Sequence, residues 1–219
     1  GGARGAAQGA EALRRSEGYY QPVIEDLVEG EETPVAIVSV QPGKRFALTQ
    51  PSVTWTAPEP DAETGSHAVA AIGLKPGDPG RAVDVIAGEG RIVAALTREG
   101  YADARAEPGR VVVDHATFTV APEYRIASGA LVRLDGLSLQ RRTRTDPAWL
   151  RGLTPWEEGD VYDPELVGEL ERRLLETGVY DGVNVALSPQ DQTNEDGLRP
   201  IVVTLTDRPR WVQEAGVTI

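Results

Sequence analysis

Apolar and polar residues alternate along several short stretches of this chain, with the period of two that is typical of a half-buried β-strand. The clearest alternation covers residues 117–126, where the apolar positions are Phe118, Val120, Tyr124 and Ile126. A second pattern at 102–114, interrupted at Pro108-Gly109, predicts the partner strand of an antiparallel hairpin. Further strands are predicted over residues 19–29, 34–40, 45–55, 130–139, 180–188 and 200–207, and residues 211–219 open another strand pattern.

Asp-Pro pairs predict where helices begin between these strands. Asp is a good N-cap, and Pro fits the first helical position, where no N–H is needed. Asp163-Pro164 precedes an apolar stripe at helical spacing, and Asp146-Pro147 precedes a short helix that ends near Gly152. Asp78-Pro79 is predicted in the same way to begin a helix that runs to about residue 99.

The helix that follows Asp78 carries two glycines in its interior. Each glycine costs about 1 kcal/mol relative to alanine inside a helix, so we expect a bend or a frayed stretch at Gly88 and Gly90. Ile86, Val93 and Leu96 are predicted to form its buried face. A loop is predicted at 57–65, a short helix at 66–73, and a bend or an edge position at the proline of residue 51.

A turn recurs three times along the chain. Gly18, Gly100 and Gly178 lie 82 and 78 residues apart, and each follows a charged helix end and precedes an aromatic residue that opens a strand. A near-constant step indicates an array of similar modules. Glycine suits this turn, because a helix that stops abruptly needs a left-handed residue just past its end.

The repeat predicts one partial and two complete domains. The partial domain covers residues 1–43, the complete ones cover 44–128 and 129–209, and Gly43 and Gly129 lie in the turns that close two of the repeats. Each complete domain reads strand, short helix, longer helix, strand, strand, which predicts a two-layer α+β fold. The incomplete first repeat predicts that the sequence begins inside a longer protein.

Charge and cysteine content exclude several classes of function. The 219 residues carry 22 Lys and Arg against 34 Asp and Glu, a net charge of −12, which argues against nucleic acid as a main partner. The chain has no Cys, so it has neither thiolate metal sites nor thiol catalysis nor disulfides, and it suits an oxidising compartment. No apolar run approaches the roughly 20 residues of a membrane-spanning helix.

A catalytic set is not found in the sequence. The chain lacks G-x-S-x-G, Walker and G-x-G-x-x-G motifs, and neither His67 nor His115 has a second ligand residue at metal-binding spacing. We therefore expect no catalytic residue, no cofactor and no metal. Arg141, Arg142 and Arg144 form a basic cluster that fits a solvated linker, lipid head groups or an acidic partner.

The module order resembles that of the POTRA (polypeptide-transport-associated) domain. The residues that carry the resemblance best are Glu158–Asp163, with its G-D turn before the longer helix, and Leu174–Asp181, with its glycine turn after it. POTRA domains form the periplasmic arm of outer-membrane protein insertases. The resemblance implies two helices packed on a three-stranded mixed sheet in each domain, with residues 210–219 leading into a barrel outside this sequence. The turn residues Gly18, Gly43, Gly100, Gly129, Gly178, Asp78 and Asp163 are then structural.

Within that superfamily the chain is most similar to TamA-like subunits of the translocation and assembly module. The run Val113–Ala116, with Ser128-Gly129 before Leu131–Gly136, carries this similarity. A BamA-like protein is the second choice, and a two-partner-secretion transporter is a further alternative. The resemblance implies a location on the periplasmic side of the outer membrane. It also implies three partners: the protein's own C-terminal β-barrel, unfolded outer-membrane or autotransporter clients, and an inner-membrane-anchored TamB-like protein.

Two functions remain open on these grounds. In the first, an extended client adds a strand to the exposed sheet edge, which the resemblance places on the second strand of each domain, at 102–113 and 180–188. The candidate client-binding residues are Asp103, Arg105, Val111, Val113, Asn184, Val185 and Ala186. In the second, the domains are a rigid spacer and docking scaffold for the inner-membrane-anchored partner, and client contacts are incidental.

Overall fold

The computed structural model describes residues 12–13, 15, 17–18, 23–29, 35–41, 44–140 and 143–208, with only the backbone of 23–29 and 35–41. The chain divides into two compact units. The first contains Gly1–Leu96 and Ala104–Gly129, and the second contains Thr97–Asp103 and Ala130–Ile219. The turn around Gly100 therefore packs with the second unit, although its sequence position lies inside the domain predicted at 44–128.

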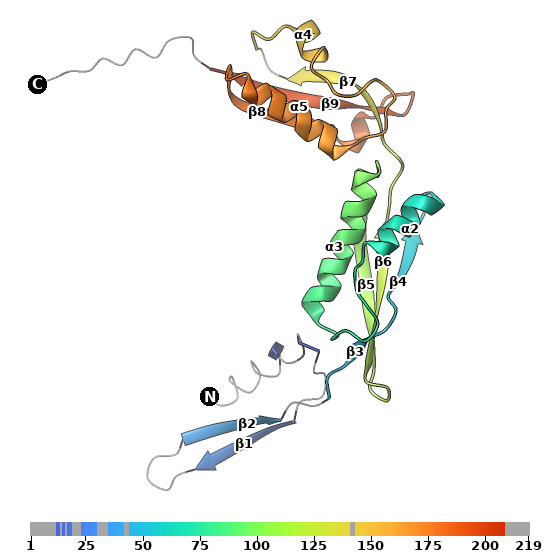
Figure 1. The fold of residues 1–219 in the computed structure, drawn as a ribbon, viewed down its shortest axis with the longest axis vertical. Coiled ribbons are helices and arrows are strands. Elements are labelled where there is room, and N and C mark those ends of the chain that lie inside the picture. The colour runs from blue at the N-terminus through green and yellow to red at the C-terminus, as the bar shows by residue number, and fades with distance from the viewer. Residues whose placement is uncertain are drawn as a thin grey trace, which may run out of the picture. The chain divides into compact units, whose positions relative to one another are not determined.

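The first unit contains a hairpin and a mixed sheet (Figure 1). The hairpin pairs β1 (Val23–Glu29) with β2 (Val35–Gln41) in antiparallel orientation. In the mixed sheet, β6 (Thr119–Ala127) is central: β3 (Ala47–Leu48) and β4 (Ser52–Thr56) run parallel to it on one side, and β5 (Arg105–Asp114) runs antiparallel on the other. The strand predicted at 45–55 is thus split around Pro51, which confirms the expected bend.

Two helices belong to this sheet, and both begin elsewhere than predicted. Helix α2 (Ala62–Ala70) starts earlier, because Asp61 caps it by accepting the amides of Glu63 and Thr64. Helix α3 (Ala82–Arg98) starts later. Asp78 does not cap it, because the backbone there pairs with β3: the Leu48 amide donates to the Asp78 carbonyl, and the Gly77 amide to the Leu48 carbonyl.

The buried face of α3 confirms the prediction at Leu96 but not at Ile86, and Val93 is half-buried. Gly88, Ile92 and Leu96 are buried, whereas Ile86 is 69% exposed. The cause is Tyr124 of β6, whose side chain stands under the helix: a Cβ on Gly88 would lie 2.6 Å from its hydroxyl oxygen. The expected bend is wrong as well, since α3 runs unbroken through Gly88 and Gly90. Gly88 makes room for a packed ring rather than for a kink.

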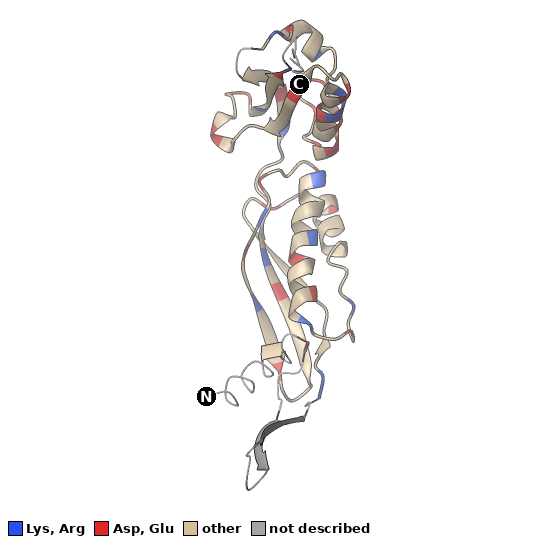
Figure 2. Cartoon of the chain, turned by 90° about the vertical axis from the view of Figure 1, so that its left-hand side faces the viewer, with Lys and Arg blue, Asp and Glu red and all other residues tan. Residues whose placement is uncertain are grey.

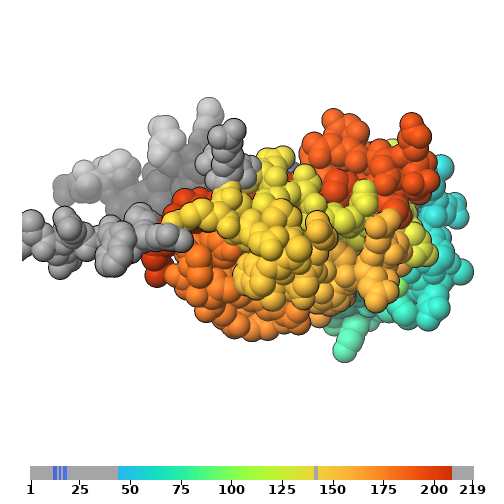
Figure 3. Space-filling view, turned by 90° about the horizontal axis from the view of Figure 1, so that it is seen from above, coloured from blue at the N-terminus to red at the C-terminus, as the bar shows by residue number. Residues whose placement is uncertain are grey.

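The second unit repeats the arrangement. Strand β9 (Leu198–Asp207) is central, β7 (Arg133–Gln140) is parallel to it, and β8 (Tyr180–Leu187) is antiparallel. Helices α4 (Pro147–Arg151) and α5 (Pro164–Glu176) begin at the predicted caps Asp146 and Asp163, and a short 3-10 turn, η1 (Gln190–Gln192), precedes β9. Figure 3 views this unit from the end where α4 lies.

The core of the second unit joins both helices to the sheet. It contains Leu134, Leu150, Trp156, Val167, Leu170, Leu174, Tyr180, Val185, Ile201, Val203 and Leu205. Acidic and basic residues are interspersed on the helices of both units (Figure 2). The predicted fold class is confirmed, because each unit has two helices on a mixed sheet. In both sheets the central strand, β6 or β9, has a parallel neighbour on one side and an antiparallel neighbour, β5 or β8, on the other.

Some predicted elements fall outside the described residues. These are the strand pattern at 211–219, the residues 42–43 that close the first repeat, and the cluster residues Arg141 and Arg142. None of the described helices is long and apolar enough to cross a membrane. Among the described residues, no group of three or more His, Asp or Glu side chains is arranged to hold a metal ion.

Candidate functional site

Hydrogen bonds on the far side of β6 determine which backbone groups of β5 face outward. The amides of Ala47 and Thr49 donate to the carbonyls of Phe118 and Val120, over 3.0 and 2.9 Å. Alternate residues of a strand direct their N–H and C=O groups to opposite sides. The even-numbered residues of β6 therefore face β3 and β4, and the odd-numbered ones face β5.

Val111 and Val113 present outward-facing backbone groups on β5. They lie opposite the even-numbered Pro122 and Val120, so they form the non-hydrogen-bonded pairs of this antiparallel ladder. Among the described strands β5 has no neighbour other than β6, which makes it an edge strand. Two of the predicted client-binding residues thus carry donors and acceptors that an added strand would use.

A hollow of about 200 Å³ lies between this edge and α3. Ile86 and Glu89 of the helix line one side, Val111 of β5 lines the other, and Tyr124 is also in its lining. Val111 is 45% exposed, so apolar surface is accessible beside the free backbone groups. Gly109, in the bulge of β5 between Glu107 and Arg110, also lines the hollow. A Cβ there would lie 2.5 Å from the Glu123 carbonyl oxygen, so this bulge requires a glycine.

Tyr124 fixes the height of α3 above the sheet. Its hydroxyl donates to the carbonyl of Val85 over 2.8 Å. Burial raises the pKa of Tyr124 to about 12, so the hydroxyl remains a neutral donor at any physiological pH. The ring therefore acts as a spacer, and the helix rests on β6 instead of closing onto β5.

The edge of the second sheet is covered from the helix side. The Ser188 amide donates to the Pro200 carbonyl over 3.0 Å, so the even-numbered residues of β8 face β9 and Val185 has outward backbone groups. The side chain of Val185, however, is only 6% exposed and belongs to the core beneath α5, which runs in close backbone contact with β8. Asn184 and Ala186 turn their backbone groups toward β9 and expose their side chains.

The prediction that Asp103 lies on the edge strand is wrong. Asp103 precedes β5 in a turn, and its carboxylate accepts from the guanidinium of Arg199 over 2.7 Å. The Arg199 side chain is only 6% exposed and also donates to the Ser188 carbonyl. A buried arginine needs a counter-charge, so Asp103 is occupied within the second unit. Arg105 lies at the start of β5, paired with Ala127 of β6.

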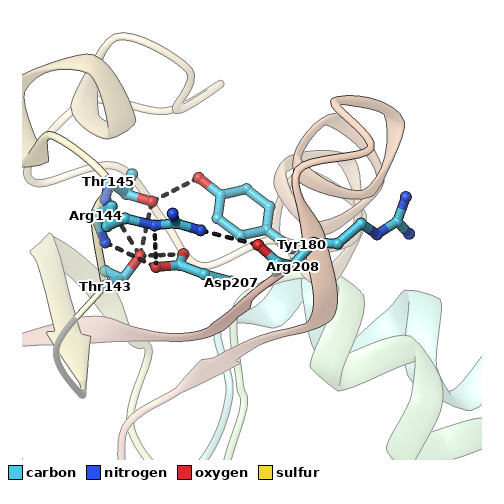
Figure 4. A network of polar contacts seen from close by, with 6 residues as sticks. All are labelled: Thr143, Arg144, Thr145, Tyr180, Asp207 and Arg208. Atoms are coloured by element: carbon cyan, nitrogen blue, oxygen red, sulfur yellow. Dashed lines mark hydrogen bonds and ion pairs between the residues drawn. The ribbon is translucent and has the colours of Figure 1, made fainter. Parts of the chain in front are cut away.

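A polar network that was not predicted from the sequence joins the loop after β7 to the first residue of β8 and the last residue of β9 (Figure 4). The hydroxyl of Thr143 and the amide of Arg144 donate to the Asp207 carboxylate over 2.7 and 2.9 Å. These hydrogen bonds lower the pKa of Asp207. Thr145 shares a 2.6 Å hydrogen bond with the Tyr180 hydroxyl. The one described member of the basic cluster, Arg144, is thus part of the fold.

The glycine turns at Gly18 and Gly100 are each held by the same pair of backbone hydrogen bonds. In the first unit the Phe46 amide donates to the Gly18 carbonyl, and the Gly80 amide donates to the Phe46 carbonyl, both over 2.9 Å. In the second unit the Val132 amide donates to the Gly100 carbonyl, and the Tyr162 amide donates to the Val132 carbonyl, again over 2.9 Å. The repeat predicted from the sequence therefore corresponds to a repeated set of backbone hydrogen bonds, which we call the backbone junction.

No family model matches the chain, but solved structures share its fold. POTRA domains 3–5 of Haemophilus influenzae BamA superpose with a TM-score of 0.57 at 22% identity, over 91% of this chain and 78% of that one. BamA from Haemophilus ducreyi lacking POTRA domains 1–3 gives a TM-score of 0.59 at 18% identity, over 74% of this chain and 30% of that one. The two units of this chain thus have the fold of tandem POTRA domains.

Proposed function

We propose that this chain belongs to the periplasmic arm of an outer-membrane β-barrel assembly or translocation protein, and that it binds unfolded clients as an added strand on β5. The observation that carries the proposal is the outward-facing backbone of Val111 and Val113 beside an open apolar hollow. The likeness to BamA structures supports the setting. The arm acts by binding and has no catalytic step.

Strand addition explains how one site accepts many clients. Main-chain hydrogen bonds supply affinity without reading the sequence, and pockets for alternate side chains select a pattern. Strands of outer-membrane barrels alternate apolar and polar residues. One apolar side chain of such a strand would enter the hollow between Ile86 and Val111, while its neighbours would point to the polar face of the sheet.

A peptide of about ten alternating residues tests this site. We expect Val111→Pro to weaken its binding about tenfold, because proline removes one outward donor and crowds the incoming strand. The ladder to β6 keeps its hydrogen bonds in this variant, since Val111 donates none to it. Val111→Ala keeps the amide and should lose less. Equal binding by a folded Val111→Pro variant would refute the site.

The cellular setting needs a separate test. An antibody against this chain should detect, in the fractionated source cells, a larger outer-membrane band whose gel mobility changes on boiling, as a folded barrel does. A soluble band near 23.5 kDa would refute the assignment to a barrel arm. That result would leave the strand-addition site on β5 standing, because the peptide experiment does not depend on a barrel.

Within this setting we propose a TamA-like protein with an inner-membrane-anchored TamB-like partner. The support is the sequence similarity in Val113–Ala116 and Leu131–Gly136. Co-purification of the parent protein from cross-linked envelopes tests it: a large inner-membrane-anchored partner is expected. Failure to recover any inner-membrane-anchored partner would refute the TamA-like assignment and leave the BamA-like alternative.

A spacer is the second candidate function, and the repeated backbone junction at Gly18 and Gly100 favours it. A role in holding distance depends on the length of each connection, whereas a strand-addition site does not. Insertion of two residues between Ser128 and Gly129 therefore discriminates the two. A spacer loses function in cells with this insertion, and a client-binding edge retains peptide affinity.

A further inference from the structure

Strand β4 forms the other edge of the first unit's mixed sheet. Among the described strands it pairs with β6 alone, in parallel orientation. Tyr124 and Ile126 of β6 direct their backbone groups toward β4, where they lie opposite Val53 and Trp55. In a parallel pair such a residue bonds to the two residues that flank its partner, so the even-numbered residues of β4 face β6. Val53 and Trp55 therefore present outward-facing donors and acceptors.

A hollow of about 540 Å³ lies beside this edge, between β4 and α2 (Figure 1). Trp55 of β4 lines it, together with Gly65 and Val69 of α2. The Trp55 ring packs against the helix, because a Cβ on Gly65 would lie 3.8 Å from a carbon of the ring. Val69 is 38% exposed. Apolar and aromatic surface is thus accessible next to the outward backbone groups of β4.

The charged side chains that line this hollow are acidic. Glu59 and Asp61 contribute to it, and no lysine or arginine of the described residues does. Asp61 also caps α2, whereas Glu59 is exposed in the loop before the helix. The hollow at β5 differs, since Arg110 lines it along with acidic residues. A carboxylate beside an aromatic ring favours a cation, because both the carboxylate and the face of the ring attract positive charge.

We propose that β4 binds an extended, arginine-bearing segment of another protein as an added strand, with the arginine beside Trp55. Because the backbone groups of Trp55 face outward, the residue opposite it on an antiparallel added strand exchanges both hydrogen bonds with it. Side chains of opposed residues lie on the same face of the sheet. An arginine at that position enters the hollow, where its guanidinium stacks on the indole and pairs with Glu59.

This site is separate from the client site on β5. It lies on the opposite edge of the sheet, and it selects a positive charge, whereas the β5 site accepts the apolar residues of an alternating strand. The proposal therefore does not rest on the proposed function.

A peptide and its uncharged counterpart test the site. The probe is a peptide of about seven alternating threonine and valine residues whose central valine is replaced by arginine, and the counterpart has citrulline, which keeps the shape without the charge. In the isotope-labelled 219-residue chain, the arginine peptide should shift the indole N–H of Trp55 and leave the other three tryptophans in place. The citrulline peptide should bind there at least about fivefold more weakly.

The parent peptide, with valine at its centre, is a probe for β5 and should leave the Trp55 signal unchanged. Equal affinity of the arginine and citrulline peptides at Trp55, or no shift at Trp55 with either, would overturn the proposal. So would a Trp55 shift of the same size with the parent peptide, because the site would then not select a charge.

Substitution of Glu59 tests the charge pairing. Glu59→Gln should weaken binding of the arginine peptide about threefold and leave binding of the citrulline peptide unchanged. Glu63→Gln is the matched control, because Glu63 is exposed in the first turn of α2 but does not line the hollow. An equal loss in the two variants would show that only the overall negative charge of the chain matters, which would contradict a site at Glu59.

Proline substitutions separate the two edges. Val53→Pro removes one outward donor and no hydrogen bond to β6, so it should weaken the arginine peptide about tenfold while the parent peptide still binds β5. Val111→Pro should have the reverse effect. Normal binding of the arginine peptide by a Val53→Pro variant that still binds the parent peptide would overturn the added strand on β4. Failure of the parent peptide to bind at all would instead refute the site on β5 and leave this one standing.

Discussion

The two sheets share one topology but differ at the edge where a client strand would add. In the first unit, β5 has a glycine bulge, an exposed valine and a helix held away by Tyr124, so its outward backbone lies beside an accessible hollow. In the second, α5 packs along β8 and buries Val185 in the core. An unpaired strand is therefore not sufficient for a binding site. The side chains packed between the helix and the edge strand determine whether apolar surface beside that strand is accessible.

Proline substitution should show this difference most strongly in stability. Val185→Pro is expected to destabilise the second unit by about 4 kcal/mol, because it disturbs a side chain packed in the core as well as one backbone donor. Val111→Pro should cost the first unit about 1 kcal/mol, since its side chain is partly exposed. Chemical denaturation of both variants measures the difference. Similar losses would show that the two edges are equally covered.

The beginnings of the two edge strands offer a second comparison. Asp103 and Asp181 lie three residues after Gly100 and Gly178, and each pairs with an arginine. Asp103→Ala should cost about 3 kcal/mol, because it leaves the buried Arg199 without a counter-charge. Asp181→Ala should cost less than about 1 kcal/mol, since its side chain and that of Arg208 are 48% and 58% exposed. Urea titrations followed by tryptophan fluorescence report both, and equal costs would contradict the role of burial.

Glycines in α3 sharpen the account of the hollow. Gly88→Ala should destabilise the first unit by about 2 kcal/mol, because the new methyl group would displace the Tyr124 ring. Gly90→Ala is the control in the same helix: its Cβ would meet no atom within 4 Å, so it should stabilise by up to about 1 kcal/mol. Thermal unfolding measures both. A stabilising Gly88→Ala variant would show that Tyr124 does not set the position of the helix.

Acid should weaken the second unit through Asp207. Its pKa is lowered in the folded state by the Thr143 hydroxyl, the Arg144 amide and the Arg144 guanidinium. A depressed pKa contributes stability above the unfolded value, near about 4, and this stability is lost as the pH falls through the folded value. Asp207→Asn should therefore flatten the loss of stability below about pH 4. Asp114→Asn, which removes a similarly lowered pKa in the first unit, should leave the second unit's acid response unchanged.

The sequence predicted the features that depend on local chemistry. Asp146 and Asp163 cap their helices as expected, Pro51 breaks the first strand, and the period-two pattern at 117–126 gives the buried face of β6. The glycine spacing also predicts the turns at Gly18 and Gly100, whose carbonyls accept equivalent backbone hydrogen bonds from Phe46 and Val132. The conformation at each of these positions depends on the residue itself or on its immediate neighbours in the sequence.

The predictions are wrong where residues distant in the sequence determine the local structure. Asp78 has the chemistry of a helix cap, but the pairing of its backbone with β3 prevents the helix from starting there. Ile86 is apolar and has the spacing of a buried helix position, but the helix packs on the ring of Tyr124 through Gly88, which leaves Ile86 exposed. Asp103 fits an exposed strand by pattern, but it is the counter-charge of Arg199, 96 residues away in sequence. None of these partners can be read from the local pattern.

Mapping a bound client peptide onto the two sheet edges tests whether clients bind to β5 rather than to β8. Isotope-labelled chain would be titrated with an alternating apolar and polar peptide while its backbone amide and methyl resonances are recorded. We expect shifts at the Val111 and Val113 amides and at the Ile86 methyl groups. These shifts should be absent in Val111→Pro, and the resonances of β8 should not change. Shifts centred on Val183–Leu187, or beside Trp55 at the opposite edge of the first sheet, would contradict it.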